Sequence, residues 1–568
     1  MKHFIASAIL SVAIACTAAA RVSLAESNGA TQLQVDGKPF IILGGELGNS
    51  SASCDTDIET IFPKLARMNL NTVLVPAYWE LTEPKEGSFD FSLTEKVIDE
   101  ARKNGLKVVF LWFGAWKNSM SCYAPEWFKA DSKRFPRSRT AAGRPLEIAS
   151  AFSPEVLEAD SKAFDAWLKH IEAYDKDNTV LMIQIENEIG MLEDARDHSA
   201  LANAEYSKGV PAELMKHLAK NKKNLHPALA EKWEAAGSKK SGSWAEVFGD
   251  DRYTDEYFMA WNYARYVEAL AGIARAINAD RPLCVNAALN SRGRRPGEYP
   301  SAGPLAHLKD IWHAASPSVD FLSPDIYDTG FADWVAQYAL PDNPLFIPEV
   351  RRDSRNAAQA YYVLGHHDAI GISPFSIENG SDAPGDPMVK AYAKLAEAMP
   401  LIAKYQGSDA MDGVLLSSES PETVITDGNI RITLSHYFTL PWDPRAKNGS
   451  PWPEAGAILI KLAPDEYMLI GTGTVAKFEH LSEGAAAAGT LGEDGFLSTG
   501  SDRTKAATAK TSASERVGLA KVEEVSIGED GTFSRVRTFN GDETHQGRHV
   551  RISVDDHKAL HIKTYNYR

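Results

Sequence analysis

An amide and a carboxylate stand side by side at the end of an apolar run. In LMIQIENEIG, residues 181–190, Asn187 and Glu188 follow a stretch with the composition of a buried strand. Far along the chain a second apolar run, Leu345–Ile347, is followed by Glu349. Two carboxyl groups about 5 Å apart can cleave a glycosidic bond with retention, because one protonates the leaving oxygen while the other attacks the anomeric carbon. That chemistry requires the ends of the two runs to meet in space.

Eight short apolar runs alternate with helix-like, amphipathic stretches between about residue 40 and residue 380. Each run has the length of a strand buried on both faces. The runs are 41–44, 72–75, 108–111, 180–185, 282–285, 319–322, 345–347 and 369–372. They predict an α/β fold, a (β/α)8 TIM barrel whose functional groups lie at the carboxyl ends of the strands. A doubly wound open sheet is the alternative, although Gly44-Gly45 leads into Glu46 rather than into a phosphate-binding loop.

The chain divides into a leader and two domains. Residues 1–25 have the charged start, apolar centre and small-residue end of a signal peptide. Residues 26–405 hold the predicted catalytic barrel, with a polar insertion at about 193–250 that we expect to form helices over the barrel mouth. Residues 406–568 show a hydrophobic period of two with turn signals, which predicts a C-terminal all-β, sandwich-like domain.

The predicted leader bears on location and on the cysteines. It predicts export, to the periplasm or the medium, with lipid attachment at Cys16 as the alternative. Cleavage leaves three cysteines. Cys54 and Cys122 fall in predicted loops and could form a disulfide in an oxidising compartment, whereas Cys284 falls in an apolar strand and is expected to be a buried thiol.

Composition excludes several classes of partner. The chain has 568 residues, of which 44% are hydrophobic and 24% charged, as in ordinary globular proteins. A net charge of -16 argues against nucleic acid, because phosphate binding needs a basic surface. The apolar part of the leader is too short to span a membrane. The predicted chemistry requires no metal and no organic cofactor, and the sequence does not determine the oligomeric state.

Around these residues the sequence resembles the clan A glycoside hydrolases, most closely the family 35 β-galactosidases. Residues 184–190 match the family's Gln-x-Glu-Asn-Glu-x-Gly, and residues 78–89 match its aromatic stretch before Glu-Pro. The resemblance spans about residues 36–400. It implies that Glu188 is the catalytic acid/base and Glu349 the nucleophile.

Five further residues are predicted to bind the sugar. The Asn187 amide can hold a sugar hydroxyl, and Glu46 at the end of the first strand can accept hydrogen bonds from others. In related barrels a tyrosine at the position of Tyr327 donates a hydrogen bond to the nucleophile. Trp116 and Tyr78 can stack on sugar rings, with packing in the core as the alternative for each aromatic residue.

Three charged residues near the predicted strand ends leave choices open. Glu378 follows the eighth strand and could replace Glu46 as the acceptor for sugar hydroxyls, although we favour Glu46. Arg351 and Arg352 follow Glu349 and could lower its pKa, as a nucleophile requires, with a place in a solvated loop favoured for at least one of them.

Together these features predict an enzyme, a retaining exo-β-galactosidase. It would release terminal β-D-galactose from oligosaccharides or plant polysaccharide fragments by a two-glutamate double displacement. Residues 44–49 and 113–118 depart from the Gly-Ser-x-His-Tyr and Cys-Ala-Glu-Trp patterns of the family, so the sugar is less determined than the mechanism. The alternatives are a retaining β-glycosidase acting on another sugar, such as a β-glucoside or a β-mannoside, and a non-catalytic carbohydrate-binding barrel.

Overall fold

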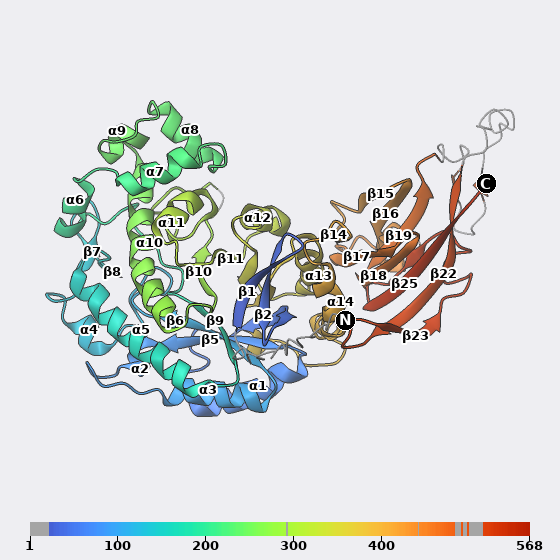
Figure 1. Ribbon diagram of the computed structural model, residues 1–568, viewed down its shortest axis with the longest axis horizontal. Helices are drawn as coiled ribbons and strands as arrows, with labels where there is room; N and C mark the ends of the chain where they lie inside the picture. Colours follow the sequence, from blue (N-terminus) through green and yellow to red (C-terminus); the bar gives the residue numbers. More distant parts are fainter. Residues whose placement is uncertain (1–21, 291–292, 441, 483–489, 492–496, 499–514) are drawn as a thin grey trace, which may run out of the picture.

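The computed structural model describes residues 22–290, 293–440, 442–482, 490–491, 497–498 and 515–568. In these ranges the chain forms a barrel domain followed by an all-β domain that lies beside it (Figure 1). Among the helices of the described residues, none combines the length and the apolar character needed to cross a membrane. The predicted lipid attachment site, Cys16, lies outside the described residues.

Eight parallel strands close into a barrel in the order β10-β11-β12-β13-β4-β5-β6-β9. The predicted (β/α)8 fold is therefore confirmed, and the open-sheet alternative is wrong because β13 pairs with β4 and leaves no edge. All but one of the strands reach further at their carboxyl ends than the apolar runs that predicted them. The strands are β4 (Ile42–Glu46), β5 (Thr72–Tyr78), β6 (Lys107–Phe113), β9 (Val180–Gln184), β10 (Leu283–Ala288), β11 (Phe321–Ile326), β12 (Phe346–Val350) and β13 (Gly371–Pro374).

Helices cover the outside of the barrel, so the strands are buried on both faces and can be apolar throughout. Several helices begin at a side chain that accepts hydrogen bonds from backbone N–H groups of the first turn: Ser153 before α5, Asp251 before α10 and Asp386 before α14. The covering helices are α1 (Asp55–Arg67), α3 (Ser92–Lys103), α5 (Pro154–Tyr174), α10 (Arg252–Ile277), α11 (Lys309–Ala315), α12 (Phe331–Tyr338), α13 (Asn356–His366) and α14 (Pro387–Tyr405).

The connections after β5, β6 and β9 carry additional elements. After β5 and β6 come two short helices, α2 (Trp79–Thr82) and α4 (Glu126–Ala130), and a hairpin, β7 (Arg137–Arg139) and β8 (Pro145–Ala149). The predicted insertion holds four helices, which gather beside α10 and α11 in Figure 1. Of these, α7 packs against α11, and α9 packs against α10. The four are α6 (Ala200–Tyr206), α7 (Ala212–Lys220), α8 (Pro227–Ala235) and α9 (Trp244–Phe248).

A small antiparallel sheet precedes the barrel. It consists of β1 (Val22–Ser27), β2 (Ala30–Val35) and β3 (Lys38–Phe40), and the chain then enters β4. Ser23 and Leu24 line a cavity with residues that precede β10 and β11, so this sheet lies at the amino-terminal end of the barrel. It therefore leaves the carboxyl end, where the polar residues gather, uncovered.

The predicted leader overlaps this sheet. Residues 1–21 lie outside the described residues, but Val22–Ala25 form the first part of β1 and pair with residues 32–35 of β2. Cleavage after Ala25 would therefore remove most of β1 from the sheet.

The all-β domain begins at Met411, shortly after α14 ends, and packs two sheets around a second hydrophobic core. Helix α13 of the barrel packs against β14 and β17. One sheet has the order β14 (Met411–Leu416), β17 (Ala455–Ala463), β18 (Glu466–Thr472), β25 (Lys558–Tyr567), β22 (Arg516–Ile527), β23 (Phe533–Thr538). The other has the order β15 (Glu422–Asp427), β16 (Ile430–His436), β19 (Thr474–His480), β24 (Val550–Arg551), and a separate pair is β20 (Thr490–Leu491) and β21 (Leu497–Ser498).

The cysteines follow the sequence prediction only in part. Cys284 is fully buried in β10, as expected. Cys54 and Cys122 are both free and exposed, so the predicted disulfide between them is wrong for this structure.

Gly456 on β17 permits close packing of the all-β domain on the barrel. A Cβ atom added there would stand 2.3 Å from the carbonyl oxygen of Ala358 in α13. We expect Gly456→Ala to lower the free energy of unfolding by about 1–3 kcal/mol, because the backbone would have to shift. Gly272→Ala, in α10 where an added Cβ meets nothing within 4 Å, is the control and should raise it by about 0.5–1 kcal/mol. Urea unfolding followed by circular dichroism measures the free energy of unfolding of both variants. An unchanged free energy of unfolding in Gly456→Ala would contradict the tight contact.

Candidate active site

Four carboxyl groups meet at the carboxyl end of the barrel. Glu46 ends β4, Asp325 lies near the end of β11, Glu349 lies near the end of β12, and Glu188 follows β9. Each of the four residues is less than 5% exposed. Barrel closure brings them together, because the ends of strands far apart in sequence face one another across the barrel mouth.

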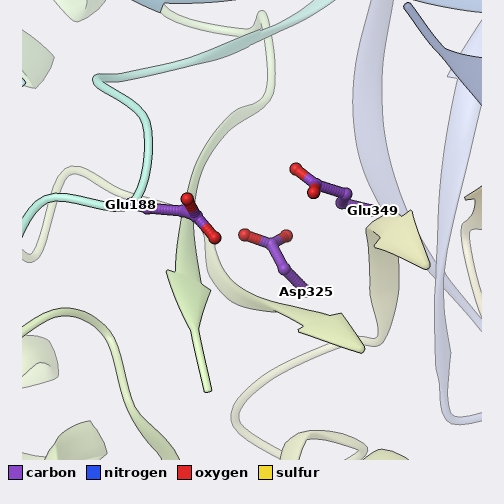
Figure 2. A group of neighbouring side chains, drawn as sticks. All are labelled: Glu188, Asp325 and Glu349. Atoms are coloured by element: carbon purple, nitrogen blue, oxygen red, sulfur yellow. The ribbon is translucent and has the colours of Figure 1, made fainter. Parts of the chain in front are cut away.

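Three of these carboxylates converge on one point. One oxygen each of Glu188, Asp325 and Glu349 lies within 4.8 Å of the others. Figure 2 shows the three groups pointing toward a common centre, with Asp325 between the other two. A separation of about 5 Å between two carboxyl groups suits direct attack by one of them, because it leaves no room for a water molecule on the attacking side. One oxygen of each of the two glutamates predicted from sequence thus lies no more than 4.8 Å from the other, close enough for both groups to act on one bond.

Hydrogen bonds hold Glu188 in an uncommon backbone conformation. Its φ of 47° lies in the left-handed region, which non-glycine residues rarely adopt. Its N–H donates to the side-chain oxygen of Asn286 at 3.0 Å, and its carbonyl accepts from the N–H of Ser119 at 3.2 Å. The Asn118 amide donates to its carboxylate. Asn286 also donates to Asp325 at 2.7 Å, so one amide links two of the carboxyl-bearing elements.

Lys117 brings a positive charge to the carboxylates. Its ammonium nitrogen lies 3.7 Å from a Glu188 carboxylate oxygen and 5.2 Å from the centroid of the Phe113 ring, and the residue is 3% exposed. Burial lowers the pKa of Lys117, but Glu188, Glu349 and the other carboxylates outweigh it, so the pKa lies above its usual value. The ammonium is therefore charged at neutral pH.

Glu349 is the carboxyl group whose ionisation the site tunes. Burial, and then the charge of Glu188, raises the pKa of Glu349 to about 7. The Tyr327 hydroxyl donates a hydrogen bond to its Oε1, as predicted, which opposes the rise. Neither Arg351 nor Arg352 is among the main causes of this pKa, and both are exposed, which bears out the solvated-loop alternative; Arg351 donates to the carbonyl of Tyr327 at 2.8 Å and 3.0 Å.

Glu46 and Asp325 are fully buried carboxyl groups with unused hydrogen-bonding capacity. Neither carboxyl oxygen of Glu46 accepts a hydrogen bond from an N–H or hydroxyl group of the described residues, although Glu46, when protonated, can donate to Glu349, and Oδ1 of Asp325 has no partner among them. Burial, followed by the charge of Glu349, holds the pKa of both groups well above its usual range. Glu378, the alternative to Glu46, instead accepts from the N–H of Gly48 and the hydroxyl of Ser51, and so stabilises the loop after β4.

The structure separates the other predicted sugar-binding residues into two groups. Asn187 lies beside Glu188, and its buried side-chain amide has no hydrogen-bond partner among the described residues. Trp116 is fully buried, with its ring nearly perpendicular to those of Tyr263 and Tyr266 of α10. Tyr78 is also buried, and its hydroxyl accepts from the N–H of Ala52. The two aromatic rings therefore offer no exposed face on which a sugar could stack.

Sequence analysis did not assign a role to Lys117, Asn118 or Asn286. Lys117 and Asn118 end the run FGAWKN, where an amine and an amide interrupt aromatic and small residues directly after a strand. The position of this amine and this amide directly after a strand was the signal from which a role at the site could have been predicted. Nothing in the sequence around Asn286 distinguished it from the rest of an apolar strand.

Two further buried carboxyl groups, those of Glu186 and Asp160, lie at the loop of residues 114–118 that follows β6. Glu186 accepts hydrogen bonds from the N–H groups of Ala115 and Trp116, at 3.3 Å and 2.8 Å. Burial, and then the charge of Asp160, holds the pKa of Glu186 well above its usual range. Glu186, two residues before Glu188, therefore belongs to the frame of the loop that carries Lys117.

Comparisons with known proteins match the barrel and the tail separately. Residues 51–293 match a family model described as beta-galactosidase, glycoside hydrolase family 42. Residues 388–491 and 474–551 match a domain of unknown function. Residues 51–293 of the barrel are therefore similar to the family 42 β-galactosidases, and the resemblance to family 35 is not supported.

Individual relatives cover part of the chain. A beta-galactosidase from Xanthomonas manihotis is 28% identical over 213 residues, which are 36% of this chain and 33% of that protein. The β-galactosidase of the haloarchaeon Halorubrum lacusprofundi is 15% identical with a TM-score of 0.44, over 62% of this chain and 58% of that one. That of Rahnella sp. R3 is 16% identical with a TM-score of 0.43, over 65% and 57%. The chain thus spans about a third of the curated relative and under two thirds of these structures.

The raised pKa of Glu349 makes a prediction about stability. The folded protein holds this proton up to about pH 7, whereas an unfolded glutamate loses it near pH 4.5. Stability from the protonated group is therefore full below about pH 4.5 and is lost as the pH rises to about 7. Glu349→Gln cannot ionise, so between pH 5 and pH 8 its free energy of unfolding should gain on the wild type by on the order of 3 kcal/mol.

Urea unfolding of both proteins at the two pH values measures the gain. Glu213→Gln, on the exposed surface of α7, controls for the loss of a carboxylate elsewhere. A difference between Glu349→Gln and the wild type that does not change with pH would contradict the assignment.

Proposed function

We propose that the protein is a retaining exo-β-galactosidase that releases terminal β-D-galactose from oligosaccharides or plant polysaccharide fragments. The observation that carries the proposal is the approach of Glu188 and Glu349 within 4.8 Å at the carboxyl end of a closed barrel. The match of residues 51–293 to a beta-galactosidase family model supports the choice of sugar.

In the proposed first step Glu349 acts as the nucleophile. One of its carboxylate oxygens forms a bond to the anomeric carbon while the bond from that carbon to the leaving oxygen breaks. Glu188 gives its proton to the leaving oxygen, and the aglycone departs as an alcohol. In the second step water adds to the anomeric carbon and gives a proton to Glu188, and the bond to Glu349 breaks with its electron pair returning to the carboxylate.

The surroundings of the two glutamates suit these roles. Tyr327 donates to Glu349 and favours the ionised form that attacks. The side-chain amide of Asn118 donates a hydrogen bond to the carboxylate of Glu188 and so fixes its orientation. Positive charge near Glu188 comes from the Lys117 ammonium, so the proposed reaction needs no metal ion and no cofactor.

Unpaired buried polar groups supply the proposed sugar contacts. An unpaired buried donor or acceptor costs about 1–3 kcal/mol, which a hydroxyl-rich ligand can offset. Glu46 and Asp325 offer acceptors or, when protonated, donors, and Asn187 offers both. The burial of these groups favours a closed site over an open cleft, and the proposal of exo action rests on it.

Two other functions remain as alternatives. The residues around the carboxylates suit any neutral β-glycoside, so a β-glucosidase or β-mannosidase shares the mechanism and differs only in contacts to the hydroxyls. A non-catalytic binding barrel would not need a nucleophile held beside an acid, as Glu349 is held beside Glu188.

We also propose that the protein is exported, on the basis of the leader-like residues 1–25. Determining the N-terminus of the secreted chain tests this proposal. The pairing of Val22–Ala25 in β1 supports retention of these residues in the mature protein.

A substrate panel with azide rescue tests the proposed roles. We expect turnover of aryl β-galactosides to fall at least about 10³-fold in Glu349→Ala and Glu188→Ala, because each loses a group that acts in the transition state. Azide should restore turnover in both, giving the α-galactosyl azide with Glu349→Ala and the β-galactosyl azide with Glu188→Ala. Nuclear magnetic resonance of the products distinguishes the anomers.

The outcomes separate the possibilities. If azide restores turnover of another β-glycoside of the panel and not of the β-galactoside, the proposed mechanism stands and the proposed sugar is wrong. Identical anomers from both variants would contradict the assigned roles, and full activity in either variant would show that its glutamate is not catalytic. Glu378→Ala, a strand-end glutamate outside the cluster, is the matched control.

Tyr327→Phe tests the hydrogen bond to the proposed nucleophile. A hydrogen bond to a charged group contributes about 1.5–3 kcal/mol, so kcat/KM at pH 7 should fall about 10–100-fold. In a plot of kcat/KM against pH, the rise on the acidic side (the acid limb) should have its midpoint near pH 7 in the wild type. In Tyr327→Phe this midpoint should move to higher pH, because Glu349 loses a group that favours its ionised form. A pH profile of kcat/KM with an aryl β-galactoside measures the shift. A loss of kcat with an unmoved acid limb would contradict this role.

A further inference from the structure

Carboxyl groups are concentrated where the proposed reaction occurs. Glu46, Glu188, Asp325 and Glu349 are all buried, and two carboxylates held close together in such surroundings disfavour ionisation of one another. The proposed mechanism nevertheless needs Glu349 ionised in a buried cluster of carboxyl groups, one of which, Glu188, has an oxygen within 4.8 Å. A positive charge in the same enclosure would relieve this conflict.

Lys117 supplies that charge from a fixed position. Its N–H donates to the carbonyl of Met120 at 2.7 Å, and the Met120 N–H returns a hydrogen bond at 3.0 Å, which closes a tight turn. Lys117 also forms a bridge with Asn187, next to Glu188. The backbone that carries the ammonium is thus tied to the backbone that carries the proposed acid.

The ammonium acts on the whole group of carboxylates and not on one partner alone. At 3.7 Å from Glu188 it is an ion-pair neighbour, while the direct hydrogen bond to that carboxylate comes from Asn118. Its charge also favours the ionised forms of Glu46, Asp325 and Glu349. Asn118 therefore orients the acid, and Lys117 supplies the field.

We propose that Lys117 is a positioning residue whose buried ammonium is the counter-charge that lets Glu188 and Glu349 stand close together with Glu349 ionised. The proposal rests on the proposed function for its catalytic consequence, but its electrostatic part concerns the folded protein alone. It assigns Lys117 to the control of protonation and leaves the binding of the sugar to Asn187, Glu46 and Asp325.

Titratable groups face Lys117 from five segments. They are Glu46 from β4, Glu188 after β9, Asp325 near the end of β11, Glu349 from β12, and the thiol of Cys122 on the loop of Lys117 itself. Because Lys117 is positive, its removal makes every one of the four carboxylates harder to ionise. The expected direction is therefore the same whichever carboxyl group holds a given proton.

Lys117→Met tests the proposal, because methionine keeps much of the apolar stem and removes the charge. The acid limb of kcat/KM for an aryl β-galactoside should move up by about one pH unit, since an opposite charge at about 4–6 Å lowers a carboxyl pKa by one to three units. Lys117→Arg should keep the limb near its wild-type position even if kcat falls. Lys107→Met, at the opposite end of β6 where the ammonium donates to the carbonyl of Asn178, is the matched control.

A second measurement does not depend on any activity. Without Lys117 the carboxyl groups stay protonated to higher pH, so the free energy of unfolding of Lys117→Met should fall further below the wild type at pH 8 than at pH 5. This measurement of stability can be made even if the protein hydrolyses no galactoside. Its failure can therefore be distinguished from failure of the proposed function. An unmoved acid limb, or a loss of stability that is equal at both pH values, would overturn the proposal and leave Lys117 as a packing residue.

Discussion

The repulsion between two buried carboxylates is the constraint on which this site depends. Glu188 and Glu349 approach within 4.8 Å in surroundings that exclude most water. Such an arrangement disfavours charge on both groups at once, and burial, followed by the charge of Glu188, raises the pKa of Glu349 to about 7. The Lys117 ammonium, the Tyr327 hydroxyl and the Asn118 amide each offset part of this cost.

The barrel provides the rigidity that the constraint demands. Repelling groups stay close only if the backbone that carries them cannot relax, and a closed sheet of eight strands has no free edge along which to open. The left-handed conformation of Glu188 shows the same principle locally. It is held by Asn286 and Ser119, which come from two different parts of the chain. Strain of this kind persists where the surrounding structure determines it.

The buried polar groups around the site are of two kinds, those without a hydrogen-bond partner and those that accept hydrogen bonds from the backbone. Next to the carboxylates stand groups without partners in the described residues, such as Asn187 and Glu46, which suit a ligand rich in hydroxyls. Beneath the loop of Lys117 stands Glu186, whose oxygens accept backbone N–H groups and are satisfied. The difference separates residues that await a ligand from those that hold the frame, although Glu186 and Glu188 lie only two positions apart.

The sequence by itself determined the barrel, the two glutamates and their hydrogen-bonding tyrosine. Eight apolar runs of strand length alternating with helices have few other solutions, and the ends of such strands meet at one face whatever the details of packing. Glu188 and Glu349 could therefore be placed together from their positions after strands, whereas the role of Tyr327 came from the resemblance to related barrels. The all-β, sandwich-like character of the tail followed from a hydrophobic period of two, but the division of its strands between two sheets did not.

What only the tertiary structure decided is which side chains face the carboxylates and how they change ionisation. Position after a strand does not reveal direction, so Arg351, two residues after Glu349, donates to the carbonyl of Tyr327, while Lys117 reaches Glu188 from the loop after another strand. Trp116 and Tyr78 looked like sugar platforms but fill the core, and Cys54 and Cys122 lie in loops without pairing. Local pattern fixes where the chain runs, but charge and contact act through space, and distances between strands exist only once the barrel has closed.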